Sequence, residues 1–158
     1  MIANKVYHQC IVNGLTIAFA ESMTGGSLAY EMIKIPGASH VISGSLIAYS
    51  IEQKIKLLDL SKTEIDEFGV VSEHVAVSMA KSVRTQLKSD MGVGVTGNAG
   101  PDKQAFTSHL EAWIAIDDQG EISTYQLTFD QLSRFKAIRK TVEFVYQQLN
   151  LILLKKQF

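Results

Sequence analysis

Short apolar runs alternate with helical stripes along this chain, and this alternation limits its fold more than any other feature. Five runs have the length and composition of strands: 15–20, 43–49, 91–95, 110–116 and 122–129. The last two are joined by Asp117-Asp118-Gln119-Gly120, a turn typical of a hairpin. Strands separated by helices form sheets that helices cover on both faces. The order predicts an α/β fold, a three-layer α/β/α sandwich around a central mixed sheet, with 16–20, 46–49 and 93–95 as inner strands.

The segments between these strands carry helix signals at their ends. Asn13-Gly14 and Pro36-Gly37 are typical stop signals, and Ser61-Lys62-Thr63-Glu64 has the spacing of a capping box. Ser72 is a suitable N-cap for a longer helix. We therefore expect helices at 2–12, after 26 to about 35, from about 52, from about 61, from 72 to 87, and from 133 to about 154.

Composition bounds the class of protein. Of the 158 residues, 46% are apolar and 20% are charged, which is ordinary for a folded chain and excludes a disordered one. The length suits one domain and no Pro/Gly/Ser-rich linker divides it, so we expect a single domain over residues 1–158. The net charge of −1 provides no basic excess for a nucleic-acid partner.

Cysteine and histidine usage favours a reducing compartment and gives no metal-site pattern. Cys10 is the only cysteine, so we expect no intramolecular disulfide and a cytoplasmic location. The start of the chain lacks the apolar run of a signal peptide, and no stretch is long enough to span a bilayer. The lack of a spanning stretch also predicts no membrane partner. The four histidines do not pair at a ligand spacing, so we expect no metal site.

Two loops of small residues follow two of the predicted strands. The first, Ala20-Glu21-Ser22-Met23-Thr24-Gly25-Gly26, opens a helix, whose unpaired N–H groups and positive dipole end suit an anion. The same sequence also fits a tight turn capped by Ser22 or Thr24. The second loop is Thr96-Gly97-Asn98-Ala99-Gly100-Pro101. Ligands of open α/β sheets gather at the carboxyl ends of strands, so we expect the two loops to line one crevice.

Tyr49 and Lys54 flank the end of a predicted strand and the start of a helix. A lysine beside a serine acts as a general base when desolvation lowers its pKa, and a tyrosine can relay a proton. The alternative is a solvated lysine and a half-buried strand tyrosine. Ser39, Ser43 and Ser45 lie nearby in the sequence, and spacing alone does not choose the hydroxyl partner.

Five motifs together resemble the CinA C-terminal domain family. Ala20 to Gly26 is similar to the family's A-E-S-C-T-G-G, and Pro36-Gly37-Ala38-Ser39 is similar to P-G-S-S. The segment from Tyr49 to Lys54 is similar to Y-S-N-E-x-K, Gly69-Val70-Val71-Ser72-Glu73 to G-A-V-S-E, and Thr96 to Pro101 to T-G-I-A-G-P. The motifs follow the family order and cover roughly residues 11–150, which makes the combination far more specific than any member.

The resemblance implies an α/β/α domain that forms homo-oligomers. It also implies a nicotinamide-nucleotide amidohydrolase, which converts nicotinamide mononucleotide to nicotinic acid mononucleotide and ammonia without a cofactor. By motif position, Ser39 is the implied nucleophile, Tyr49 and Lys54 are its activating partners, and Ser22 is the rival hydroxyl. The implied substrate-binding residues are Ser22, Thr24, Gly25, Gly26, Thr96, Gly97 and Arg139. Of these, Arg139 would meet the phosphate, with Arg134 as the fallback.

The chain departs from the family pattern at three places. Met23 replaces the usual cysteine, and Ile51 replaces the usual asparagine after the tyrosine and serine. The family's glycine-rich stretch after G-P is shortened here to residues 102–111. Two alternatives to the deamidase therefore stay open: a relative that acts on a different amide, and a non-catalytic nucleotide-binding or assembly module of the same fold.

Overall fold

The computed structural model describes residues 1–103 and 109–157, which form a five-stranded mixed sheet and six α-helices. The strands are β1 (Ile17–Glu21), β2 (Ile42–Ile47), β3 (Met91–Gly97), β4 (Glu111–Asp118) and β5 (Glu121–Thr128). The helices are α1 (Ile2–Asn13), α2 (Ser27–Ile33), α3 (Ile51–Leu58), α4 (Lys62–Phe68), α5 (Glu73–Gln86) and α6 (Arg134–Leu154). The strand order is β2-β1-β3-β4-β5, parallel among the first three and antiparallel from β3 to β5. The predicted α/β fold with a mixed sheet is confirmed.

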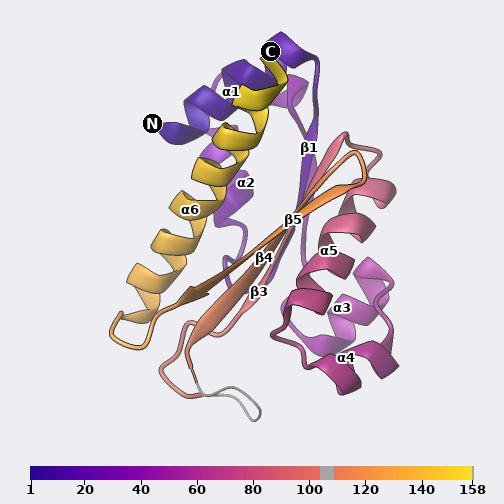
Figure 1. Cartoon of the computed structure of the whole chain (residues 1–158), viewed down its shortest axis with the longest axis vertical. Helices are drawn as coiled ribbons and strands as arrows, with labels where there is room; N and C mark the ends of the chain where they lie inside the picture. Colours follow the sequence, from indigo (N-terminus) through magenta and orange to yellow (C-terminus); the bar gives the residue numbers. More distant parts are fainter. Residues whose placement is uncertain (104–108, 158) are drawn as a thin grey trace.

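Helices cover both faces of this sheet. Figure 1 shows α1, α2 and α6 on one side and α3, α4 and α5 on the other. Successive residues of a strand point to opposite faces, so Phe19 joins the core under α6, with Tyr146, while Ala18 joins the core under α5, with Met79. Burial on both faces explains why β1 is apolar along most of its length.

One predicted strand position is wrong. Residues 46–49 were expected in an inner strand, but β2 ends at Ile47 and lies at the edge of the sheet, paired only with β1 within the described residues. The inner strands are β1, β3 and β4. An edge position leaves most of β2 half-exposed, and the apolar pattern of a strand does not report how many neighbours it has.

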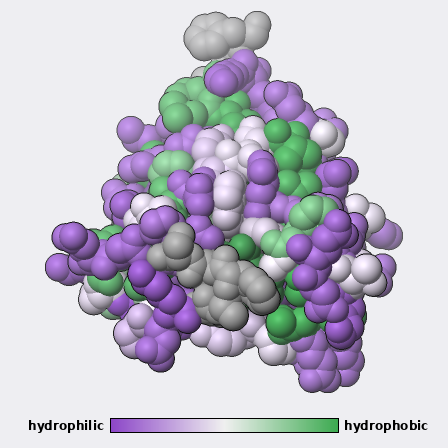
Figure 2. All heavy atoms as spheres, turned by 60° about the horizontal axis from the view of Figure 1, so that its bottom comes forward, coloured by the Kyte–Doolittle hydropathy of each residue, from purple (hydrophilic) through white to green (hydrophobic). Residues whose placement is uncertain are grey.

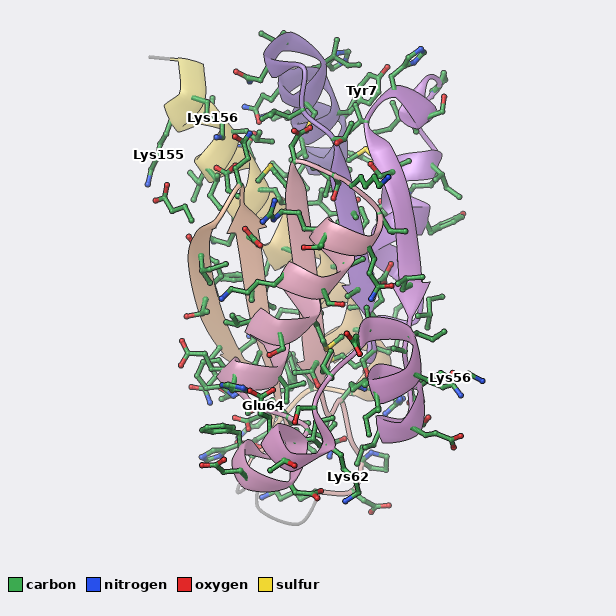
Figure 3. The ribbon with its side chains drawn as sticks, turned by 90° about the vertical axis from the view of Figure 1, so that its right-hand side faces the viewer. Tyr7, Lys56, Lys62, Glu64, Lys155 and Lys156 are labelled. Atoms are coloured by element: carbon green, nitrogen blue, oxygen red, sulfur yellow. The ribbon has the colours of Figure 1, made fainter. Side chains whose placement is uncertain are left out.

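Gly92 and Gly94 of β3 let α5 pack directly on the sheet. A Cβ added at Gly94 would lie 2.6 Å from the backbone nitrogen of Ala80 and 2.9 Å from Cβ of Met79. Figure 3 shows α5 lying along the strands, with α3 and α4 beside one of its ends. The close packing of α5 on β3 sets the position of α5 on this face of the sheet, and α3 packs against α5.

The strands β1 and β3 are parallel neighbours, so their carboxyl ends lie at the same end of the sheet. The segments that follow them therefore lie next to each other. Figure 2 looks onto the lower end of the molecule in Figure 1, where these strands end and hydrophilic residues surround scattered hydrophobic ones. The stretch 102–111, which departs from the family pattern, lies partly at this end, and its residues 104–108 are outside the described residues.

Candidate active site

A buried lysine and a serine meet at the carboxyl end of β1. The Lys54 Nζ atom donates a hydrogen bond to Ser22 Oγ at 2.8 Å. It also donates to the backbone carbonyls of Ala48 at 2.9 Å and Tyr49 at 3.2 Å. Only 2% of Lys54 is exposed, and no carboxylate is among these three partners. Burial without a carboxylate partner disfavours the charged form of a lysine.

The local sequence explains why Lys54 points inward. Ser50 caps α3 by accepting a hydrogen bond from the Gln53 backbone nitrogen, which sets the rotation of the helix. Lys54 and Leu58, one turn apart, are then the buried residues of α3, whereas Lys56 lies on the exposed face. Figure 3 shows Lys56 reaching away from the molecule. The prediction of a desolvated lysine is therefore confirmed, and the alternative of a solvated Lys54 is excluded.

Burial changes the acid–base chemistry of this lysine. Desolvation lowers the pKa of Lys54 from 10.5 to about 8. At pH 7 roughly a tenth of the side chain is then neutral, compared with far less than a hundredth for an exposed lysine. A neutral amine 2.8 Å from a serine hydroxyl is within reach of its proton, so the pair has the geometry of a nucleophile and its base.

Ser39 does not lie beside Lys54. It is exposed and belongs to the 3-10 turn Ala38–His40, which comes before β2 and therefore lies at the amino end of the parallel strands. Ser22 and Lys54 lie at the carboxyl end. The expectation that Ser39 is the hydroxyl partner of Lys54 is wrong for this structure, because a whole strand separates the two. Ser22, the rival hydroxyl, takes that place.

Tyr49 contributes its backbone, and not its hydroxyl, to the environment of Lys54. The residue is 60% exposed, and its Oη accepts a hydrogen bond from Arg134 Nη2 at 2.7 Å. The other terminal nitrogen of Arg134 donates to the Gly100 carbonyl at 2.7 Å. Arg134 thus ties the start of α6 to both the segment after β2 and the loop after β3, and its two hydrogen-bond acceptors here are uncharged.

The predicted anion site at the start of α2 is wrong, because the chain fills it with its own carboxylate. Glu21 Oε2 accepts from the backbone nitrogens of Gly26 and Leu28, each at 3.0 Å, and Oε1 accepts from Ala29 at 3.0 Å. Ser45 Oγ on β2 donates to the same carboxylate at 3.1 Å. Sequence reasoning assigned no role to Glu21, whose carboxylate occupies this position. A charged residue at the end of a buried strand was the available signal, since such a residue needs several partners.

The turn that carries Ser22 uses both of its glycines in the left-handed region. Gly25 has φ +56° and Gly26 has φ +95°, conformations that residues with a Cβ seldom adopt. Thr24 is 2% exposed, and its hydroxyl has no hydrogen-bond partner among the described residues. An unpaired buried hydroxyl costs about 1–3 kcal/mol. The turn therefore holds one polar atom that a substrate or a solvent molecule would satisfy.

The loops after β1 and β3 come together, as predicted. A Cβ added at Gly97 would collide with the Met23 sulfur and lie 2.7 Å from the Glu111 carbonyl. The glycine therefore permits the close approach of the two loops. Thr96 is buried, and its Oγ1 donates to the Val70 carbonyl at 2.7 Å, so its hydroxyl anchors the segment before α5.

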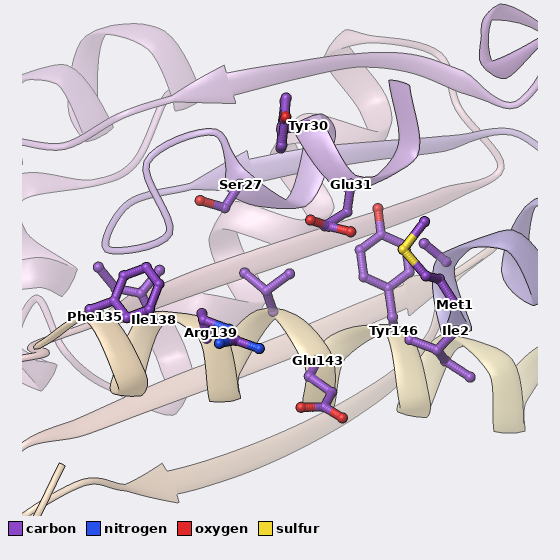
Figure 4. A pocket seen from close by; sticks show the side chains of 12 residues that line it. Met1, Ile2, Ser27, Tyr30, Glu31, Phe135, Ile138, Arg139, Glu143 and Tyr146 are labelled. Atoms are coloured by element: carbon purple, nitrogen blue, oxygen red, sulfur yellow. The ribbon is translucent and has the colours of Figure 1, made fainter. Parts of the chain in front are cut away.

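Arg139 lies on α6, in a groove between α2 and α6. The groove has a volume of 690 Å³, and Figure 4 shows Arg139 on its α6 wall with Phe135 and Glu143, facing Ser27 and Glu31 of α2. The Arg139 guanidinium lies 5.7 Å from the centre of the Phe135 ring. Neither Ser22 nor Lys54 lines this groove, so the structure does not bring Arg139 together with them.

The described part of the chain lacks two features. No cluster of three or more His, Cys, Asp and Glu side chains there has the arrangement of a metal site. No helix there has the length and apolar character needed to cross a bilayer.

Comparison with protein families identifies relatives of this chain. The family described as the CinA C-terminal domain matches residues 1–153. A CinA-like protein of Gemmatimonas aurantiaca is 38% identical over 122 residues, which cover 77% of this chain and 28% of that protein. A CinA-like protein of Dictyoglomus turgidum is 36% identical over 123 residues, covering 77% and 30%. The chain thus matches less than a third of the length of these relatives.

Solved structures share the fold. A competence or damage-inducible protein of Enterobacter asburiae superimposes with a TM-score of 0.93 at 25% identity, over 96% of both chains. A competence/damage inducible protein of Agrobacterium tumefaciens gives a TM-score of 0.91 at 25% identity, over 96% of this chain and 93% of the other.

Proposed function

Because this chain belongs to the CinA C-terminal domain family, we propose that it is an amidohydrolase that converts nicotinamide mononucleotide to nicotinic acid mononucleotide and ammonia. The observation that carries the proposal is the hydrogen bond from Lys54 to Ser22. A core lysine bonded to a serine and two carbonyls is a costly arrangement for a scaffold, since burial lowers its pKa to about 8. It is a useful arrangement for activating a hydroxyl.

In the proposed first half-reaction, Ser22 Oγ attacks the carboxamide carbon while neutral Lys54 takes the hydroxyl proton. Backbone N–H groups near Ser22 or Thr96 would stabilise the resulting oxyanion. The tetrahedral intermediate collapses as its C–N bond breaks, and Lys54 returns the proton to the leaving nitrogen, so that ammonia departs. The product of this step is an ester between Ser22 and the nicotinoyl group.

In the second half-reaction, water attacks the ester carbon and passes a proton to Lys54. The ester C–O bond breaks, and Ser22 recovers its proton from Lys54. Across both steps one amide and one water give one carboxylic acid and one ammonia. Ser22 and Lys54 end as they began, so the proposed chemistry is balanced without a further reactant.

We assign phosphate recognition to Arg134. Its guanidinium bonds to Tyr49 Oη and the Gly100 carbonyl, at the end of the sheet where Ser22 and Lys54 lie. Both acceptors are neutral, so a phosphate would be the stronger partner for this cation. The other candidate, Arg139, lies in the groove between α2 and α6 and would serve only a substrate that extends into it.

Ammonia release from a panel of amides tests this function. Nicotinamide mononucleotide, nicotinamide riboside, nicotinamide and benzamide are compared with the purified wild-type chain, and the acid product is identified by mass spectrometry. The proposal predicts turnover of the mononucleotide with kcat/KM at least about tenfold above that of the riboside. Preferential hydrolysis of a non-nucleotide amide would favour a relative with another substrate. No ammonia from any amide would favour the non-catalytic module.

A further inference from the structure

Glu21 is a buried carboxylate with four hydrogen-bond donors around it. It is 0% exposed, and its partners are the backbone N–H groups of Gly26, Leu28 and Ala29 and the hydroxyl of Ser45. A buried charge is tolerated only when such bonds replace its water. A neutral glutamine has one accepting oxygen in place of two, so it would leave some of these donors without an acceptor.

The four donors come from two separate elements. Gly26 is the N-cap of α2, Leu28 and Ala29 lie in the first turn of that helix, and Ser45 belongs to β2. The first N–H groups of a helix have no partner within the helix, so the Glu21 carboxylate satisfies donors at the start of α2 and helps to hold the helix at this position. The same carboxylate connects α2 to the edge strand through Ser45.

The turn between these contacts contains Ser22. Its beginning is held because Glu21 is the last residue of β1 and accepts a hydrogen bond at its backbone carbonyl from the Ala48 nitrogen at 2.9 Å. Its end is held because Gly26 donates to the Glu21 side chain. One residue therefore fixes both ends of the short turn that presents Ser22.

The backbone of Glu21 also reaches the lysine. The Ala48 backbone nitrogen donates a hydrogen bond to the Glu21 carbonyl, and the Ala48 carbonyl accepts one from Lys54 Nζ. The Glu21 side chain turns toward the start of α2, whereas Ser22, the residue directly after the strand, meets Lys54 of α3. Glu21 thus adjoins Ser22 in the chain, and its carboxylate accepts hydrogen bonds from the end of the turn and from β2.

We propose that Glu21 is the positioning residue of this site: its carboxylate holds the Ser22 turn so that Ser22 Oγ stays within reach of Lys54. This inference rests on the proposed function for its kinetic test. Its structural consequence is independent of the substrate, because the orientation of Ser22 is a property of the free protein.

The test compares Glu21→Gln with Ser45→Ala. Glu21→Gln disturbs the turn, whereas Ser45→Ala removes one donor that lies outside the turn. We expect Glu21→Gln to lower kcat on nicotinamide mononucleotide about 100-fold while KM changes less than about threefold, because a misplaced nucleophile affects the chemical step most. Ser45→Ala is expected to keep kcat within about threefold of wild type. A folded Glu21→Gln variant with wild-type kcat would overturn the inference.

Two readouts separate this inference from the proposed substrate. The rate at which phenylmethylsulfonyl fluoride modifies Ser22, followed by mass spectrometry, is expected to fall about as far as kcat in Glu21→Gln. Hydrogen exchange at the Leu28 and Ala29 amides is expected to be slow in wild type and fast in Glu21→Gln. If the wild-type chain is labelled at Ser22 but hydrolyses no nucleotide, only the proposed substrate is contradicted. The labelling rate of Glu21→Gln relative to wild type then decides whether Glu21 positions Ser22. An unlabelled wild-type Ser22 contradicts the inference.

Glu21→Asp covers the case in which Glu21→Gln does not fold. It keeps the charge but is one methylene shorter, so it reaches fewer of the four donors. We expect slower Ser22 labelling and faster Leu28 exchange in this variant too. If Glu21→Asp were labelled at Ser22 as fast as wild type although its Leu28 amide exchanged fast, the turn would not position Ser22. That result would overturn the inference.

Discussion

Lys54 Nζ and Ser22 Oγ lie 2.8 Å apart although 32 positions separate them in the sequence. The strand–helix order brings them together, because Ser22 directly follows β1 and α3 begins just after β2, the parallel neighbour of β1. A buried amine with a pKa lowered to about 8 has a pH-dependent charge near neutrality, and this property provides the first tests.

The rate of deamidation is expected to rise with pH and level off above about pH 8. Lys54 acts as a base only when neutral, and burial lowers its pKa to about 8. A pH profile of kcat/KM for nicotinamide mononucleotide from pH 6 to pH 9.5 measures this directly. A rate that falls steadily over this range would mean that protonated Lys54 is the active form.

The same titration is expected to affect stability. Lys54 has a lower pKa in the folded protein, about 8, than the 10.5 of the unfolded chain. Between these values the unfolded state holds the extra proton, so the contribution of Lys54 to stability rises with pH across this window and its burial cost is fully felt below it. The free energy of unfolding of wild type minus that of Lys54→Met is expected to rise by about 2 kcal/mol between pH 8 and pH 10.

Urea unfolding at several pH values measures this difference, with Lys56→Met as the matched control. Lys56 lies on the same helix but is exposed. Its wild-type-minus-variant difference is expected to stay flat. A flat difference for Lys54→Met as well would argue against a desolvated lysine.

Removal of Arg134 is expected to weaken substrate binding more than catalysis. Arg134→Ala should raise KM for nicotinamide mononucleotide about tenfold or more with a smaller effect on kcat, because a remote phosphate contact acts equally in ground and transition states. The preference for the nucleotide over the riboside should shrink. Arg139→Ala is the comparison, since Arg139 lies in the α2–α6 groove. The reverse ranking of the two variants would move phosphate recognition to that groove.

Gly94→Ala is expected to destabilise the fold by about 3 kcal/mol. Its Cβ would lie 2.6 Å from the Ala80 backbone nitrogen, so α5 would have to move away from β3. Gly14→Ala is the control, because Gly14 has φ +63° but no atom within 4 Å of an added Cβ. That variant carries only backbone strain, about 1 kcal/mol. Equal unfolding free energies for the two variants, measured in urea, would contradict the close packing of α5.

Many of the helix boundaries could be predicted, because they depend on residues at the helix ends. Ser61 and Ser72 cap α4 and α5 by accepting hydrogen bonds from the backbone nitrogens of Glu64 and Val75, as N-cap serines do. Gly14 ends α1 in the left-handed conformation. The edge position of β2 could not be predicted, because strand order depends on long-range pairing that apolar runs do not encode.

The site was predictable only in part, for a similar reason. The family resemblance implied a serine partner for Lys54, but the choice of Ser22 over Ser39 depends on which end of the sheet each residue occupies. That choice requires the parallel pairing of β1 and β2. Glu21 was missed because its four donors come from α2 and β2, elements that meet only in the folded chain.

Ammonia release by Ser22→Ala and Ser39→Ala, each measured beside wild type on nicotinamide mononucleotide, tests the central claim most directly. Ser22 bonds to Lys54, whereas Ser39 is exposed in the turn before β2. Ser22→Ala is expected to lose about 1,000-fold or more in kcat, and Ser22→Ala combined with Lys54→Met is expected to be little worse, because the two residues act as a unit. Ser39→Ala is expected to stay within about threefold of wild type. Loss of activity in Ser39→Ala, with Ser22→Ala remaining active, would contradict the assignment of Ser22 and Lys54 as the reacting pair.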